Sequence, residues 1–300
     1  MAQRIVNRIV PGSALSLGIM RSVMHGAFLI TILVTSFSDL GQLPTTILRP
    51  VGAMKLLPWS FYDQLLNPAT MTVLKWVMIL SLLLSTAGYL TSLTTKVSFL
   101  FVVFYEGLVR SFGHFNHDEM IGVYFLCVLA FSPCGDSFSL DRWSERKSPK
   151  SSSFVYSYPI LLMQLLLAWA YFSSALVKLR VAGLKYFAVD NLPTLAIYHS
   201  LDNLHDTNFR LAFLLPQVRW LLPYIVGVVL LWELLFPLTV LFRRIRWWIL
   251  GFGVVFHLTT LPVMNVFFPY FLISYLVFVN WDRVAAKLRQ SVQPVETRDR

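Results

Sequence analysis

Long apolar runs alternate with short polar or basic segments along nearly the whole chain. Most of the runs are long enough to cross the roughly 30 Å hydrocarbon core of a bilayer as an α-helix, which takes about 20 residues. The pattern predicts eight such helices, near residues 13–37, 70–90, 96–113, 118–133, 158–179, 221–242, 247–263 and 266–281. We therefore expect an all-α fold, a polytopic bundle of about eight transmembrane helices over residues 13–281.

Two stretches do not fit this pattern. Residues 38–69 hold four prolines with aromatic residues between them, and prolines at that density interrupt regular structure. We expect a partly ordered external loop there, with its aromatic residues suited to a membrane interface. Residues 282–300 are polar, and we expect a disordered cytoplasmic tail.

Composition and charge distribution support the membrane assignment. The chain is 56% hydrophobic and 13% charged, whereas a soluble domain carries about 25% charged residues. The net charge of +10 alone would also suit nucleic acid. However, with eight spans most basic residues outside the spans fall on the side that holds both termini, which the positive-inside rule makes cytoplasmic. The sequence thus predicts the lipid bilayer as a partner and no nucleic acid.

Several ionisable residues lie inside the predicted spans, where an unpaired charge is costly. Arg21 and His25 are four residues apart in the first span, and so are Glu106 and Arg110 in the third, so each pair shares one helix face. Glu106 and Arg110 can form a structural ion pair, alone or with Arg21. Alternatively, they form the polar wall of a functional cavity.

Lys178 lies at the end of the fifth span, after the small residues Ser173, Ser174 and Ala175, which allow another helix to approach closely. A lysine in this position has two plausible roles. It can extend its ammonium group to the lipid headgroups as an anchor. It can also face inward, lose its proton more easily and act as a base.

Another polar cluster follows the fifth span and contains His199, Asp202, His205 and Asp206. These residue types can bind a metal ion, but their spacing also suits a solvated helix face. We expect no metal site.

Three segments taken together resemble the HTTM family, the membrane domain of vitamin K-dependent gamma-carboxylases. They are HFNHDEMIGVYFLCVLAFSPCGDSFSLDRW (114–143), YFSSALVKL (171–179) and the stretch from ELLFPLTVLF to VFVNWD (233–282). The resemblance covers most of the chain in the same order. It implies an HTTM-type transmembrane domain over residues 13–281.

The resemblance also implies roles for particular residues. In the carboxylase, a lysine in the matching segment is thought to deprotonate reduced vitamin K, a hydroquinone, which makes Lys178 the candidate base. His117 and His257 match the family's histidines and join Lys178 as candidate catalytic residues. Asn116 also comes from this match as a candidate for substrate binding, and the polar stripe of the predicted spans adds His114, Glu106, Arg110 and Arg21. The implied cofactor is a reduced vitamin K-type quinone, bound in a cavity that faces the exoplasmic side.

Two other functions remain open. The carboxylase presents its protein substrate with a large lumenal domain after the membrane helices, and we do not expect this chain to recognise proteins by that route. Small bacterial proteins of the SdpB type carry a similar membrane domain and are associated with the maturation of secreted peptides. That role would make a small peptide the partner and the bacterial inner membrane the location. A non-catalytic quinone- or lipid-binding protein is the third alternative.

Overall fold

The computed structural model describes residues 12–113, 118–145, 154–202 and 211–292. Within these ranges every regular element is a helix, as the apolar pattern predicts. The chain divides into two compact units. The first unit comes from residues 1–163 and 276–300, and the second unit is Gln164–Tyr275.

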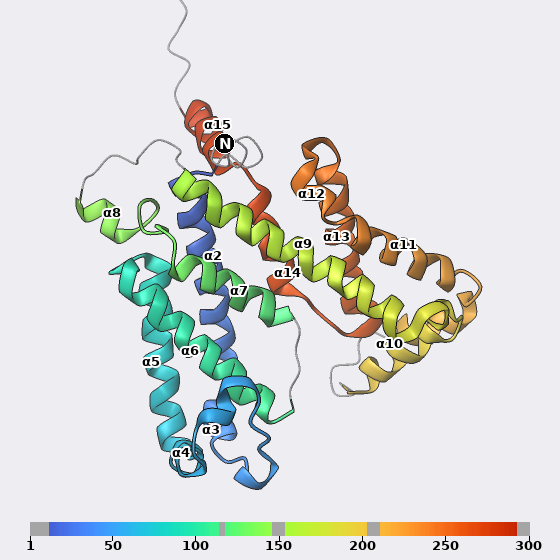
Figure 1. Cartoon of the computed structure of the whole chain (residues 1–300), viewed down its shortest axis with the longest axis horizontal. Helices are drawn as coiled ribbons and strands as arrows, with labels where there is room; N and C mark the ends of the chain where they lie inside the picture. Colours follow the sequence, from blue (N-terminus) through green and yellow to red (C-terminus); the bar gives the residue numbers. More distant parts are fainter. Residues whose placement is uncertain (1–11, 114–117, 146–153, 203–210, 293–300) are drawn as a thin grey trace, which may run out of the picture. The chain divides into compact units, whose positions relative to one another are not determined.

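The first unit is built around α2, whose inward face is set by apolar residues three or four positions apart. Helix α2 packs against α5 and α7, and α6 packs against the same two helices (Figure 1). The α-helices of this unit are α2 (Ala14–Val34), α3 (Phe37–Leu40), α4 (Trp59–Leu65), α5 (Pro68–Ala87), α6 (Thr91–Ser111), α7 (Asp118–Ala130), α8 (Leu140–Glu145), the start of α9 (Phe154–Ala182) and α15 (Trp281–Val292). Its short 3-10 turns are η1 (Thr45–Ile47), η2 (Gly52–Leu56) and η6 (Tyr275–Phe278), the last at the boundary between the units.

The ends of α5 follow from local chemistry. The side chain of Asn67 accepts a hydrogen bond from the backbone N–H of Thr70 at 2.9 Å, and Pro68 occupies the first turn, where no N–H is needed. The helix ends at Gly88, which has φ 74° in the left-handed region. A Cβ there would also lie 2.6 Å from a guanidinium nitrogen of Arg21. Both the backbone conformation and the close approach of Arg21 therefore require glycine at this position.

The proline-rich segment 38–69 contains short helices and is anchored to the first unit. The hydroxyl of the buried Tyr62 donates to the carbonyl of Met54 at 2.5 Å. The backbone N–H of Arg49 donates to the carbonyl of Ser111, at the end of α6, at 2.7 Å. These bonds stabilise a segment in which the prolines allow only short helices.

The expectation of a disordered tail after residue 281 was wrong for its first part, because Trp281–Val292 forms α15. The side chain of Asn280 caps this helix by accepting a hydrogen bond from the backbone N–H of Arg283 at 3.1 Å. Apolar residues also recur at helical spacing among the polar residues of this segment. The overall polar composition does not reveal that spacing. Residues 293–300 lie outside the described residues.

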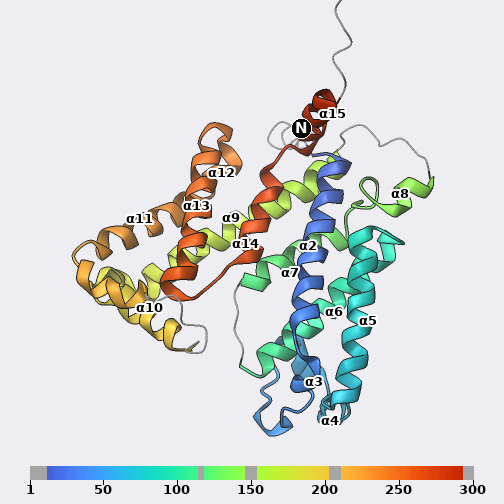
Figure 2. The same cartoon turned by 180° about the vertical axis from the view of Figure 1, so that it is seen from behind.

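The second unit holds the remainder of α9 and the elements up to residue 275. Its helix α13 contacts α10, α11, α12 and α14 (Figure 2). Its elements after α9 are η3 (Gly183–Phe187), α10 (Asn191–Asp202), η5 (Leu211–Val218), α11 (Leu222–Leu235), α12 (Leu238–Leu241), α13 (Arg243–Met264) and α14 (Pro269–Ser274).

Five of the described helices are long and apolar enough to cross a membrane. They are α2, α5, α6, the α9–η3 helix and α13. A sixth candidate is the pair η5 and α11, which meet at a bend of 110°. By contrast, α7 has 13 residues and the apolar helix Pro269–Phe278 has ten, fewer than the roughly 20 that a span requires. The predicted count of eight therefore stays a prediction.

Candidate functional site

The side chains of Lys178 and Glu233 form an ion pair in the second unit. The ammonium Nζ of Lys178, on α9, donates to Oε1 of Glu233, on α11, at 2.5 Å. The hydroxyl of Ser174, one turn earlier on α9, donates to the same oxygen at 3.3 Å. Only 5% of the Glu233 side chain is exposed, against 28% for Lys178. Apolar helices thus hold a carboxylate away from water, with a cation on one side of it.

The sequence places these groups through two local features. Ser174 and Lys178 are four residues apart, so both lie on the face of α9 that meets α11. Glu233 lies in the last turn of α11, which ends at Leu235, shortly before Pro237. A proline cannot continue the hydrogen-bond ladder, so the predicted continuous span 221–242 is broken here.

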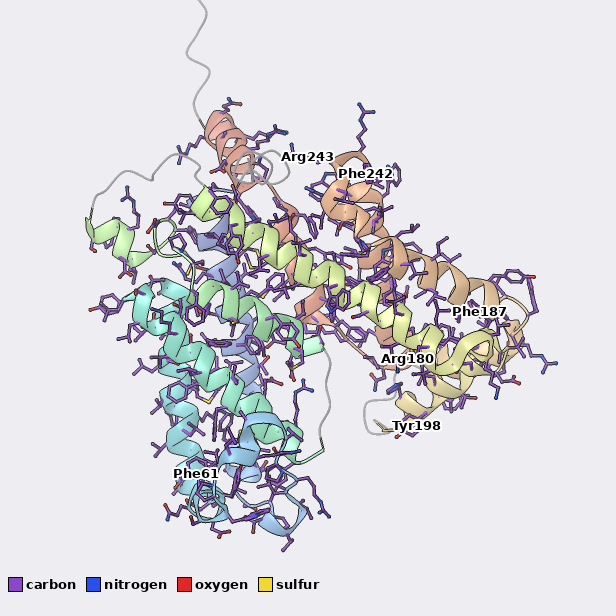
Figure 3. The ribbon with its side chains drawn as sticks, viewed as in Figure 1. Phe61, Arg180, Phe187, Tyr198, Phe242 and Arg243 are labelled. Carbon is purple, nitrogen blue, oxygen red and sulfur yellow. The ribbon has the colours of Figure 1, made fainter. Side chains whose placement is uncertain are left out.

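Aromatic residues complete the surroundings of the Lys178 ammonium group. The ring centroid of Tyr186, on η3, lies 5.9 Å from Nζ of Lys178, within the range of a cation–π interaction. Phe187 follows on η3 and lies beside α11, where its ring is 3.7 Å from the position of a Cβ at Gly227 (Figure 3). The 3-10 turn after α9 therefore packs back against α11 near the ion pair.

A second polar group is the hydroxyl network around Tyr171. The hydroxyl of Tyr171, on α9, is hydrogen-bonded to Nε2 of His257 at 2.6 Å and to the hydroxyl of Tyr275 at 2.7 Å. His257, on α13, is 3% exposed. Its Nδ1 is buried and has no hydrogen-bond partner in the described part of the chain. A Cβ at Gly253 would clash with the Tyr275 hydroxyl, so glycine permits this close approach to α13.

The ion pair and the hydroxyl network both include residues of α9. The ion pair joins α9 to α11, and the network joins α9 to His257 on α13 and to Tyr275. Tyr171 precedes Ser174 by three residues and Lys178 by seven, spacings that keep all three on one face of α9. The ring of Tyr171 stacks on Phe236 with a centroid distance of 4.0 Å and meets Trp232 edge-on at 4.8 Å. Both of these aromatic residues flank Glu233 on α11. The result is one row of polar groups inside an aromatic shell.

Two buried polar atoms of the row differ from the others. Oε2 of Glu233, like Nδ1 of His257, has no hydrogen-bond partner within the described residues. Buried polar atoms are normally paired, and an exception needs an explanation such as a bound ligand or a catalytic role. Chemically, the arrangement can accept and release protons beside a flat aromatic surface.

Three of the predicted site residues, Arg21, Glu106 and Arg110, belong to the first unit. Glu106 and Arg110 face the interior and form the predicted ion pair on α6, at 3.5 Å. Arg21 does not join that pair. Its fully buried guanidinium donates to the backbone carbonyls of Cys134 at 3.0 Å and Phe138 at 2.5 Å. These carbonyls belong to the turn after α7, so Arg21 holds that turn against α2.

The remaining predicted residues fall largely outside what the structure describes. His114, Asn116 and His117 lie outside the described residues, and so do His205 and Asp206 of the second polar cluster. Within the described residues, no group of three or more histidine, cysteine, aspartate or glutamate side chains is arranged to hold a metal ion.

The sequence reasoning missed the partners of Lys178 and His257. Glu233 could have been predicted as a partner, because it is the acidic residue within the sixth predicted span and a carboxylate at that depth requires a partner. Tyr171 could have been predicted to share a helix face with Lys178, because the two residues are seven positions apart. Tyr275 gave no such signal, because only the packing of the chain brings it to Tyr171.

The helical fold, the apolar helices and the buried polar row define a multi-pass α-helical membrane protein. A family model for the HTTM domain matches residues 10–282. The chain belongs to the HTTM family. The comparison with curated proteins and the comparison with solved structures each gave no match.

Proposed function

We propose that this HTTM-family protein binds a hydroquinone-type molecule from the bilayer and uses Lys178 to remove a proton from one of its hydroxyl groups. The observation that carries the proposal is the ion pair of Lys178 with the buried Glu233, whose Oε2 has no hydrogen-bond partner in the described chain. Ionisable groups within membrane spans are costly and typically mark functional sites. The distribution of basic residues favours a site on the exoplasmic side.

The residues of the polar row suit such a ligand. A hydroquinone is a flat aromatic ring with hydroxyl groups, and it dissolves in the membrane interior. The aromatic shell offers matching surfaces, and Glu233 Oε2 and His257 Nδ1 offer hydrogen-bonding atoms. When bound, the hydroquinone supplies an acidic hydroxyl group and the electrons for reaction with oxygen.

Glu233 gives Lys178 a route to the unprotonated form that a base requires. Proton transfer from the ammonium group to Oε1, across the 2.5 Å hydrogen bond, leaves a neutral amine and a carboxylic acid. The amine of Lys178 then accepts the substrate's hydroxyl proton and becomes an ammonium group again. The ammonium group, which is partly exposed, passes the substrate's proton on to water, and the amine takes the first proton back from Glu233. Each proton thus has a named donor and a named acceptor.

The hydroxyl network gives His257 a fixed orientation. The hydrogen bond between the Tyr171 hydroxyl and His257 engages Nε2, so Nδ1 is the ring nitrogen that remains for a ligand oxygen. Tyr275 in turn holds the Tyr171 hydroxyl. We assign His257 a role in orienting the substrate, with Lys178 as the base.

The test is the conversion of hydroquinone to epoxide by the purified protein, with peptide glutamates present and absent. Lys178→Arg should lower the rate by about 10²- to 10⁴-fold, the usual contribution of a general base, since a guanidinium keeps its proton. The matched control is Lys185→Arg, at an exposed lysine on η3, which should leave the rate unchanged. A fully active Lys178→Arg protein with a normal melting temperature would overturn the role of Lys178 as the base.

The same protein distinguishes the other two functions. An accessory protein for peptide maturation would show no hydroquinone turnover but would be required for the processing or export of a small secreted peptide encoded beside it. A passive binding protein would show neither activity, yet a quinone or lipid would raise its melting temperature.

A further inference from the structure

Helix α15 has one apolar stripe on an otherwise polar surface. Trp281, Val284, Ala285 and Leu288 follow the spacing of an amphipathic helix, with offsets of three, four and seven. The charged residues of the helix are Asp282, Arg283, Lys287 and Arg289, three basic and one acidic, which give a net charge of +2. Such a helix combines a narrow hydrophobic face with a basic polar face.

This helix is fixed directly after an apolar segment. Only two residues, Val279 and Asn280, separate the apolar helix Pro269–Phe278 from Trp281. The indole N–H of Trp281 donates to the carbonyl of Leu276 at 3.2 Å, and the side chain of Asn280 caps the new helix. These bonds hold the start of α15 at the end of the apolar segment.

Part of the apolar stripe is uncovered in the first unit. Helix α15 contacts α2, and Trp281 and Ala285 are half-buried. Val284, however, is 37% exposed and Leu288 is 61% exposed. The described part of the chain therefore leaves the C-terminal half of the stripe without an apolar neighbour that covers it.

We propose that α15 is an interfacial anchor, whose apolar stripe enters the headgroup region of the bilayer while its basic residues bind the phosphates of anionic lipids. Lys287 and Arg289 are the immediate neighbours of Leu288, so on a helix they project about 100° to either side of it. Long basic side chains at the edges of an apolar stripe can reach the headgroups while their stems stay in apolar surroundings. This inference stands independently of the chemistry at Lys178.

The charges favour anionic lipid over a protein as the occupant. Each lysine or arginine near an anionic membrane surface contributes enough to change binding by about fivefold. A cation on each side of the stripe matches a surface with negative groups on every side of the helix. A partner helix in a groove would instead require the stripe to be flanked by a complementary polar pattern.

The experiment uses the full-length protein in lipid nanodiscs, in a background with Cys127→Ser and Cys134→Ala. A single environment-sensitive fluorophore is attached at Leu288→Cys, and the matched control carries it at Gln290→Cys, an exposed position on the polar face. The nanodiscs contain phosphatidylcholine with or without phosphatidylglycerol, plus lipids that carry a shallow nitroxide quencher. Quenching by the lipid at residue 288 should exceed quenching at 290 several-fold, and only when phosphatidylglycerol is present.

Removing the flanking charges provides the second measurement. The double substitution Lys287→Gln and Arg289→Gln should weaken the binding of α15 to membranes that contain phosphatidylglycerol by about 25-fold, a factor of about five for each cation removed. Equal lipid quenching at 288 and 290, or equal quenching in both lipid mixtures, would overturn the proposal. Protection of position 288 from aqueous iodide without lipid quenching would also overturn it, because a protein surface would then cover the stripe.

Discussion

Two buried ion pairs, one in each unit, are built in different ways. In the first unit, Glu106 and Arg110 lie four residues apart on the single helix α6, and their nearest charged atoms are 3.5 Å apart. In the second unit, Lys178 and Glu233 lie on different helices and approach to 2.5 Å. Both carboxylates are 5% exposed, and each keeps one oxygen without a hydrogen-bond partner in the described chain.

The difference lies in what each pair connects. The pair on α6 joins two positions that the helix already holds together. The pair between α9 and α11 depends on how those helices pack, and it belongs to a row with Ser174 and Tyr171. The Glu233 carboxylate, on α11, lies beside the amine of Lys178, on α9, and this arrangement suits proton transfer between them.

Arg21 shows a third way to bury a charge. Two of its guanidinium nitrogens donate to the backbone carbonyls of Cys134 and Phe138, in the turn after α7. A planar group with five donors can bind several carbonyls at once, which lysine cannot do in the same geometry. In the first unit this buried cation therefore serves the fold, whereas we assign chemistry to the lysine of the second unit.

The largest expected effect is a difference in activity between two matched substitutions. Glu233→Gln should reduce hydroquinone turnover by about 10²- to 10⁴-fold, because an amide cannot take the proton from Lys178. Glu106→Gln makes the same chemical change in the other pair and should leave turnover within a few-fold of the parent. Equal losses would remove the contrast and favour the interpretation of Glu106 as part of a functional cavity wall.

The next effect is on stability and compares single with double substitutions. Arg110→Ala alone strands the buried Glu106 carboxylate and should cost about 3–5 kcal/mol, while the double change with Glu106→Ala should cost less than the sum of the two singles. The same cycle on Lys178 and Glu233 should give a larger coupling energy, because the atoms are closer and two helices are joined.

Chemical denaturation in detergent micelles measures both cycles. Additive losses for Glu106 and Arg110 would show that this pair contributes no coupling. A larger coupling on α6 than between α9 and α11 would reverse the comparison.

The smallest effect concerns the closed environment around Arg21. Burial raises the pKa of Cys134, from 9.0 for a model thiol to about 11. At pH 8 its thiolate fraction should therefore be roughly 100-fold below that of a model thiol, and labelling by a thiolate-directed reagent should slow to match. In a Cys127→Ser background, the labelling rate should keep rising with pH up to about 11. A rate that levels off near pH 9 would show that this part of the first unit is open to water.

The sequence alone determined the features that depend on local spacing. Apolar runs predict the membrane helices, and α2, α5, α6 and α13 lie close to their predicted positions. The spacing of four between Glu106 and Arg110 places them on one face of α6, whatever surrounds that helix. The resemblance of three segments to the HTTM family was likewise available from the residues alone, and the family match over residues 10–282 confirms it.

Only the tertiary structure decided which helix faces meet. The partners of Lys178 and Tyr171 lie 55 and 86 residues further along the chain, and no local rule selects Glu233 or His257 over other polar residues. Arg21 bonds to carbonyls 113 and 117 residues away rather than to a carboxylate, because packing brings that turn to α2. Periodicity sets the face on which a side chain lies, whereas the group opposite that face depends on how all the helices pack at once.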